Sequence, residues 1–183
     1  FAGGDAAIHG SGCEQGDGDV DIQTNGNAVT VQYSALKVEL PANNQTLAAR
    51  SACSVAIPVE IPVGWTLKRQ EQWAVFGWQK TAGSSGDFSA SGRLTAFDPD
   101  AGMSSPLSSQ QQGRMSVQRI ERSSDLRSIS SDLCRNRQPF KGVVQINVGA
   151  VGQRQKPEQT LQIHMTSGEH RYGLTFQLER CPS

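Results

Sequence analysis

Apolar and polar residues alternate along much of the chain, and the longest alternating run lies between residues 53 and 67. Its odd positions carry large apolar side chains or a cysteine: Cys53, Val55, Ile57, Val59, Ile61, Val63, Trp65 and Leu67. Because successive side chains of a strand point to opposite faces, this run predicts one long strand with one buried face. Pro58 and Pro62 lie on its other face and cannot donate ladder hydrogen bonds, which favours a sheet edge or a bend.

The same alternation recurs on both sides of this run. Residues 29–33 alternate after Asn25-Gly26-Asn27, a turn sequence typical of a hairpin. The alternation changes phase between Ser34 and Leu36, as a β-bulge would produce. Three further alternating runs occupy residues 144–150, 161–165 and 172–178. We therefore expect an all-β protein: a single antiparallel β-sandwich of about seven to nine strands, with at most one short helix and two disulfides.

Three segments depart from the alternation. Residues 98–113 are rich in Ser, Gln, Gly and Pro without any period, which predicts a long loop. The apolar residues of 126–133 are spaced as on a helix, and we place the one short helix there. Residues 1–12 are small and Gly-rich and predict a flexible N-terminal tail. The remainder, residues 13–183, is expected to form one disulfide-bonded domain.

Composition and charge narrow the class of protein. The 183 residues carry 17 basic and 17 acidic side chains, and no apolar run reaches the roughly 18–20 residues of a membrane span. Zero net charge argues against a nucleic-acid partner. Residues 1–60 hold seven acidic and two basic side chains, so residues 61–183 carry the compensating positive charge. This asymmetry raises the hypothesis of head-to-tail assembly.

Four widely spaced cysteines, Cys13, Cys53, Cys134 and Cys181, indicate two structural disulfides. A zinc site is poorly supported, because no CxxC pair occurs and no histidine lies at a ligand spacing. Of the three pairings we favour Cys13–Cys53 with Cys134–Cys181. Disulfides form in oxidising compartments, so we expect a secreted, cell-surface or periplasmic protein. The start at Phe1 is what removal of a signal peptide leaves, although an arbitrary boundary would look the same.

The order of the cysteines and their neighbours resembles a known family. Four sequence blocks carry the resemblance: Gly10-Ser11-Gly12-Cys13, Arg50-Ser51-Ala52-Cys53, Pro62-Val63-Gly64-Trp65 and Leu178-Glu179-Arg180-Cys181. Between them, Cys134 precedes a strand with Val144, Ile146 and Asn147. From about Ile8 to Cys181 the chain is similar to the secreted proteins grouped as domain of unknown function family 4360. The resemblance implies secretion and a β-rich, disulfide-bonded fold; it implies no activity and no catalytic residues.

Asp17, Asp19 and Asp21 are the candidate metal ligands. Their D-x-D-x-D spacing suits calcium if the segment is a loop, since calcium takes hard oxygen ligands. A calcium loop that began at Asp17 would need an acidic ligand at position 28, which is Ala28. We therefore favour a solvated acidic edge that deters strand pairing, and we expect no metal and no cofactor.

No arrangement of residues points to catalysis. His164 lies on the outward face of its alternating run and His170 on the inward face of the next run, so their side chains should face opposite sides. No G-x-S-x-G motif occurs, and the acidic residues are scattered, with only Glu71 near an aromatic residue, Trp73. We expect no catalytic residues and no enzyme; a hydrolase stays open as a third hypothesis, although no motif supports it.

Trp73 and Trp78 are the candidate binding aromatics. They have opposite parity, so one of them is expected to face solvent, whereas Trp65 continues the buried face of its run and is assigned to the core. Asn44-Gln45-Thr46 is a glycosylation sequon, which is used only in a eukaryotic secretory route.

Two functions fit these expectations. The first is a non-catalytic, secreted or cell-surface structural protein that self-assembles into a filament or sheath by strand addition of the N-terminal tail to a neighbour. The alternative is a monomeric secreted module that binds glycans or a protein partner through the segment 98–113 and exposed aromatic residues. Neither includes a nucleic-acid partner or a membrane span.

Overall fold

The structure, a computed structural model of the chain, describes residue 1 and residues 6–43, 45–81, 83–95, 102–107, 113–114, 118–165 and 170–182. Within these residues the chain is all-β, with antiparallel strands in three sheets. The β12 sheet has the order β1 (Ala7–His9), β5 (Ala48–Ile61), β12 (Phe140–Arg154), β8 (Ser84–Leu94), β9 (Gly102–Leu107). The β14 sheet has the order β11 (Gln118–Asp125), β6 (Trp65–Phe76), β14 (Arg171–Arg180), β3 (Ala28–Tyr33), β2 (Val20–Asn25). The β13 sheet has the order β10 (Gly113–Arg114), β7 (Trp78–Lys80), β13 (Leu161–Met165), β4 (Lys37–Leu40).

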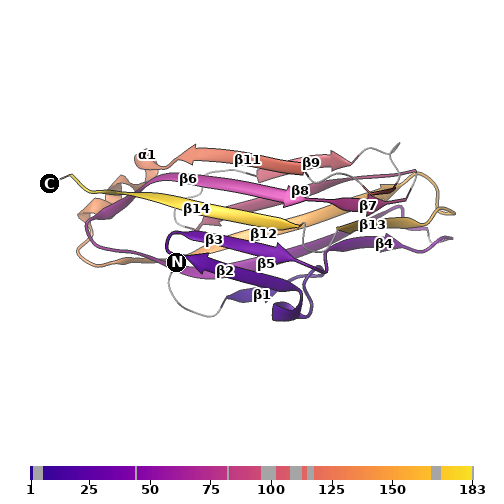
Figure 1. Cartoon of the computed structure of the whole chain (residues 1–183), viewed down its shortest axis with the longest axis horizontal. Coiled ribbons are helices and arrows are strands. Elements are labelled where there is room, and N and C mark those ends of the chain that lie inside the picture. The colour runs from indigo at the N-terminus through magenta and orange to yellow at the C-terminus, as the bar shows by residue number, and fades with distance from the viewer. Residues whose placement is uncertain are drawn as a thin grey trace.

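The β14 and β13 sheets lie end to end and form one layer of a sandwich (Figure 1). Strands β6 and β7, β14 and β13, and β3 and β4 follow one another along the long axis, in the same order across both sheets. The phase change at Ser34–Leu36 is therefore a break between β3 and β4, where the chain passes from one sheet to the next, instead of a bulge. The β12 sheet forms the other layer, and the inner faces of both layers make one core.

The last third of the chain occupies the middle of the molecule. β12, β14 and β13 are each the third strand of their sheet, with strands from residues 1–61 on one side and strands from residues 65–125 on the other. The acidic N-terminal segment thus supplies one lateral edge of all three sheets. The strands of residues 61–183, which carry the positive charge, form the middle and the other edge.

The alternating run of residues 53–67 divides into two strands. Its odd positions from Cys53 to Ile61 are buried, as the pattern predicts. β5 ends at Ile61, however, and β6 begins at Trp65 in the opposite layer, because Pro62 and Gly64 (φ 86°) turn the chain. Of the two prolines, only Pro58 lies in β5, which is next to the edge strand. β1 pairs only with Ser54–Ala56, so it does not reach Pro58.

Two segments expected to be irregular contain strands. Residues 7–9 of the expected flexible tail form β1, and residues 102–107 of the expected long loop form β9 on the edge of β8. Neither segment has an amphipathic pattern. β1 and β9 form because β5 and β8 each offer a free edge to pair with. This pairing overrides the weak strand propensity of Gly- and Ser-rich sequence.

One short helix follows β11, as expected. α1 (Arg127–Ser130) continues into a 3-10 turn, Ser131–Arg135, and the carboxylate of Asp125 accepts a hydrogen bond from the backbone N–H of Arg127 at 2.9 Å. Leu126 and Leu133 are buried, which explains the helical spacing in the sequence. Among the described residues, no helix has the length and apolar character to cross a membrane.

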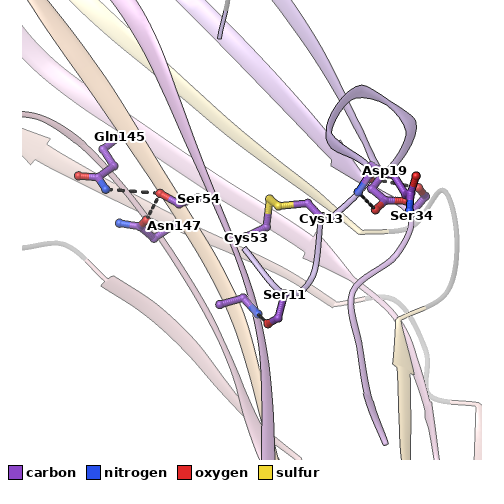
Figure 2. Close-up of a disulfide and its surroundings, with 10 residues drawn as sticks. Ser11, Cys13, Asp19, Ser34, Cys53, Ser54, Gln145 and Asn147 are labelled. Atoms are coloured by element: carbon purple, nitrogen blue, oxygen red, sulfur yellow. Dashed lines mark hydrogen bonds between the residues drawn. A yellow bond between two sulfur atoms is a disulfide. The ribbon is translucent and has the colours of Figure 1, made fainter. Parts of the chain in front are cut away.

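The disulfides join Cys13 with Cys53 and Cys134 with Cys181, the pairing favoured from the sequence. The first ties the N-terminal segment to β5 (Figure 2), and the second ties the 3-10 turn after α1 to the residue that follows β14. They close loops with sequence separations of 40 and 47 residues. The chain-entropy model gives about 4 kcal/mol of stabilisation for each. Two such bonds are typical of a protein from an oxidising compartment.

Candidate functional site

The outer face of the β14 sheet carries a depression of about 390 Å³. It lies where β6 and β11 pair, and its lining residues are Glu71, Gln72, Trp73, Arg119, Glu121, Arg122 and Ser123. Along β6, Gln70, Gln72 and Ala74 are buried, so the intervening odd positions point outward. The register places Glu121 of β11 directly beside Trp73.

Trp73 spreads over the neighbouring strand. Its cross-strand partner on β14 is Gly173, and a Cβ atom at Gly173 would lie 2.1 Å from two atoms of the indole ring. The indole therefore lies directly on the glycine backbone, in space that any other residue would fill. This arrangement holds the ring against the sheet surface, and Trp73 as a whole is only partly buried.

Charged and amide groups flank the indole on both sides. The guanidinium carbon of Arg119 lies 4.9 Å from the centroid of the Trp73 ring, and its Nε donates to Glu121 at 2.7 Å. On the other side, Glu71 accepts a hydrogen bond from Gln177 at 3.1 Å. The depression thus combines an aromatic surface with carboxylate acceptors and guanidinium donors, and its two acidic and two basic lining residues balance in charge. Such a combination suits a ligand rich in hydroxyl groups.

The other tryptophans lie elsewhere. Trp78 is 1% exposed and stacks on Phe76 in the core, which removes it from the candidate binding aromatics. Parity anticipated that one of the pair would face outward, and this is Trp73. Trp65, assigned to the core from the sequence, is only partly buried, and Arg180 lies 5.2 Å from its ring centroid. Trp65 is not part of the depression.

The acidic run near the N-terminus lies in a turn and at the start of β2. Residue 17 is in a 3-10 turn (Gly16–Gly18), Asp19 accepts a hydrogen bond from the backbone N–H of Gln15 at 2.9 Å, and Asp21 accepts one from Gln23 at 3.1 Å. Among the described residues, no three His, Cys, Asp or Glu side chains gather as a metal site would require. Asn44 of the sequon lies outside the described residues.

His170 is fully buried between the layers. Its ring makes edge contacts with Tyr33 and Phe88, with ring centroids 5.3 and 4.5 Å away, and neither ring nitrogen has a hydrogen-bond partner. Burial lowers the pKa of His170 from 6.5 to about 3, because the charged form loses its hydration. His164, by contrast, is exposed and lies 2.6 Å from a carboxylate oxygen of Glu39. The two histidines face opposite sides, as their places in the two alternating runs indicate, and they share no site.

A second hollow, of about 310 Å³, opens between the layers at one end of the sandwich. Its walls are mainly apolar and include Val59, Leu67, Leu94 and Phe176. The ring of Phe1 lines it, with its centroid 6.1 Å from that of Phe176. This groove is therefore lined in part by the chain's own first residue.

Sequence reasoning identified Trp73 but missed the residues around it. Arg119 and Glu121 lie in a stretch rich in arginine, and Gly173 lies in an alternating strand with nothing to mark it. What brings them together is the register of β11 and β14 against β6. Register across distant strands leaves no local pattern, so single-sequence reasoning had no means to find these partners.

Comparison with known proteins identifies the family and little else. The family model described as Domain of unknown function (DUF4360) matches residues 4–181, in agreement with the resemblance found in the sequence. No curated protein matches the chain.

Several solved structures are distantly similar, each with 11% identity. TmCBM61 in complex with β-1,4-galactotriose has a TM-score of 0.24 over 96% of this chain and 88% of its own. The enzymatically active domain of tailspike protein 4 of bacteriophage CBA120 has a TM-score of 0.30 over 92% of this chain and 19% of its own. The glycoside hydrolase domain of Endo-D from Streptococcus pneumoniae R6 has a TM-score of 0.23 over 93% of this chain and 21% of its own. Scores this low carry no information on function.

Proposed function

The chain belongs to the DUF4360 family, whose description assigns no activity, and from its site we propose that it is a non-catalytic, secreted module that binds neutral glycans. The outer face of the β14 sheet is the binding surface, and Trp73 is its aromatic platform. Secretion is supported by the two disulfides, which persist only in an oxidising compartment.

The observation that carries this proposal is the position of the Trp73 indole on Gly173. An aromatic ring held against a sheet by a glycine has no packing role in the core, and it presents an apolar surface beside polar groups. Sugars have the matching character, since their C–H faces are apolar and their hydroxyl edges both donate and accept hydrogen bonds. Glu71 and Glu121 supply acceptors next to the ring, and Arg119 supplies donors.

Arg119 covers part of the ring in the unbound protein. An exposed cation–π contact contributes about 0.5–1 kcal/mol, and the side chain of Arg119 is 56% exposed. A ligand therefore displaces this guanidinium at small cost. The displaced group stays beside the ring because Glu121 holds it through the hydrogen bond at 2.7 Å.

Affinity electrophoresis tests the proposal. Gels containing laminarin, galactan, xylan or galactomannan are run beside gels containing the acidic polymer polygalacturonate. We expect retardation by at least one neutral polysaccharide and none by the acidic one. Trp73→Ala should weaken this binding by about 30-fold or more, the effect of losing an aromatic anchor. Trp65→Ala is the matched control, because Trp65 is also a partly buried β6 tryptophan with an arginine over its ring, outside the depression. Equal effects of the two variants, or no binding to any neutral polysaccharide, would contradict the proposal.

A second candidate function, self-association by exchange of the N-terminal segment, is favoured by how that segment is held. β1 contacts β5 over only three residue pairs, and the Phe1 ring packs in the apolar groove. A second copy presents the same edge and groove, so it can accept the same segment. Gly10 and Gly12 lie against Ala52, and a Cβ atom at Gly10 would be 2.3 Å from the carbonyl oxygen of Ala52. The next residue, Cys13, is fixed to β5 by its disulfide with Cys53, so the segment can leave only up to this point. An exchange would therefore hinge at Gly10–Gly12.

Light-scattering mass during size exclusion separates the two candidates. Exchange predicts dimers or larger species that disappear when residues 1–9 are deleted, with the Cys13–Cys53 bond left intact. A native mass near 19.7 kDa at all concentrations would contradict autonomous assembly and leave the glycan-binding proposal untouched.

A further inference from the structure

The outer face of the β14 sheet extends well beyond the depression. The register aligns one outward residue from each of its five strands in a row across the sheet: Glu121, Trp73, Gly173, Thr30 and Gln23. Neighbouring strands are about 4.8 Å apart, so this row spans about 19 Å. A single sugar on the indole would occupy only part of that length.

The two halves of the face differ in chemistry. The β11 and β6 half is charged, with Arg119, Glu121, Arg69 and Glu71 pointing outward around Trp73. The half formed by β14, β3 and β2 carries two outward charged residues, Arg171 and Asp21, at one end. Its other outward side chains are mainly hydroxyls and amides: Thr175, Gln177, Thr30, Gln32, Gln23 and Asn25. The indole bridges the halves, because it starts on β6 and lies over β14.

Thr30 and Gln23 are placed to continue the contact. They are direct cross-strand partners on β3 and β2, and Thr30 is also the partner of Gly173, the residue beneath the indole. Thr30 is partly buried and Gln23 is exposed, so both side chains are within reach of a ligand on the surface. Neither carries a charge, and both can donate and accept hydrogen bonds.

On the premise that the proposed glycan binding is correct, we propose that the ligand is an uncharged glycan chain of several sugars. The chain lies across the strands from Trp73 to Gln23. Trp73 stacks one sugar, and Thr30 and Gln23 form a second subsite for the sugars that follow. The face thus selects polymers over mono- and disaccharides by their length.

A length series tests this inference by calorimetry with cello-, laminari- and galacto-oligosaccharides of one to six sugars. Affinity is expected to rise with length before it levels off. The double variant Thr30→Ala/Gln23→Ala should weaken hexasaccharide binding by about tenfold and leave disaccharide binding unchanged. Gln145→Ala/Ser91→Ala, an amide and hydroxyl pair on the outer face of the β12 sheet, is the matched control and should change neither.

The possible results separate this inference from its premise. If Trp73→Ala abolishes binding while the Thr30/Gln23 variant binds the hexasaccharide as the native protein does, the second subsite is wrong and the glycan-binding proposal stands. If the native protein binds oligosaccharides of all lengths with equal affinity, the second subsite is again wrong and the glycan-binding proposal again stands. If no oligosaccharide binds the native protein, both proposals fail.

Discussion

The two layers of the sandwich differ on both of their faces. At the centre of the β14 layer, Gly173 is covered by the indole of Trp73, whereas at the centre of the β12 layer, Gly149 lies between Ala52 and Ser89 with room for a Cβ atom. Inside, the β12 sheet presents aliphatic residues such as Val55, Ile146 and Val148. The inner face of the β14 layer carries buried Gln70, Gln72, Tyr172, Tyr33 and His170.

The outer face of the β12 sheet satisfies its own polar groups. Ser54 donates to the side-chain oxygen of Asn147 at 2.8 Å, and Gln145 donates to Ser54 at 3.4 Å (Figure 2). The buried glutamines of the β14 layer bond across to the other layer instead: Gln70 donates to the carbonyl oxygen of Gly92 in β8, and Gln72 accepts from the N–H of Gly92. Burying polar groups costs stability unless they are hydrogen-bonded. The proposed binding surface lies on the β14 layer, and on this proposal the β12 layer is its scaffold.

Lowering the pH should have the largest effect on stability, and it acts through His170 on the inner face of the β14 layer. Its pKa is about 3 in the folded protein against 6.5 normally, so the unfolded chain takes up the proton first. This contribution to stability is complete above pH 6.5 and is lost as the pH falls towards 3, by about 1.4 kcal/mol per pH unit. Urea denaturation of the native protein and of His170→Leu between pH 7 and 4 measures it. The difference between the two stabilities should shift in favour of the variant as the pH falls; a constant difference would show that His170 is not buried in its neutral form.

Gly173→Ala should have the next largest effect. The new methyl group occupies the space of the indole, so the ring must lift from the sheet, and we expect a loss of about 1–3 kcal/mol of stability together with the loss of glycan binding. Thermal unfolding and tryptophan fluorescence report the two changes. Unaltered fluorescence and binding would show that the indole does not rest on this glycine.

Gly149→Ala should have the smallest effect, and it is the counterpart of Gly173→Ala on the other layer. The nearest atoms to its Cβ position are 3.5 Å away or more, which is ordinary contact. Replacing a glycine within a strand by alanine then changes stability by less than about 1 kcal/mol and tends to increase it. A loss as large as that of Gly173→Ala in the same thermal assay would remove the proposed distinction between the layers.

The sequence predicted what depends on local pattern. Alternation identified the buried positions of β5 and predicted that one of Trp73 and Trp78 faces solvent. The disulfide pairing favoured from the sequence is the one in the structure. β1 and β9 were not predicted, because their pairing depends on free edges of distant strands. Trp78 was also a candidate because opposite parity predicts that one of the two tryptophans faces solvent but does not show which one. The row from Glu121 to Gln23 could not be predicted either, because it depends on the register of five strands that are distant in sequence.

The three indole N–H resonances offer the most direct test, because each tryptophan reports one location. Trp73 lies in the depression, Trp65 lies on the same strand outside it, and Trp78 lies in the core. In proton–nitrogen correlation spectra assigned with Trp→Phe variants, the native protein is titrated with the oligosaccharide that binds most tightly. The account predicts that the Trp73 resonance shifts with saturation while the Trp65 and Trp78 resonances stay in place. A saturating shift at Trp65 alone, or no shift at Trp73, would contradict it.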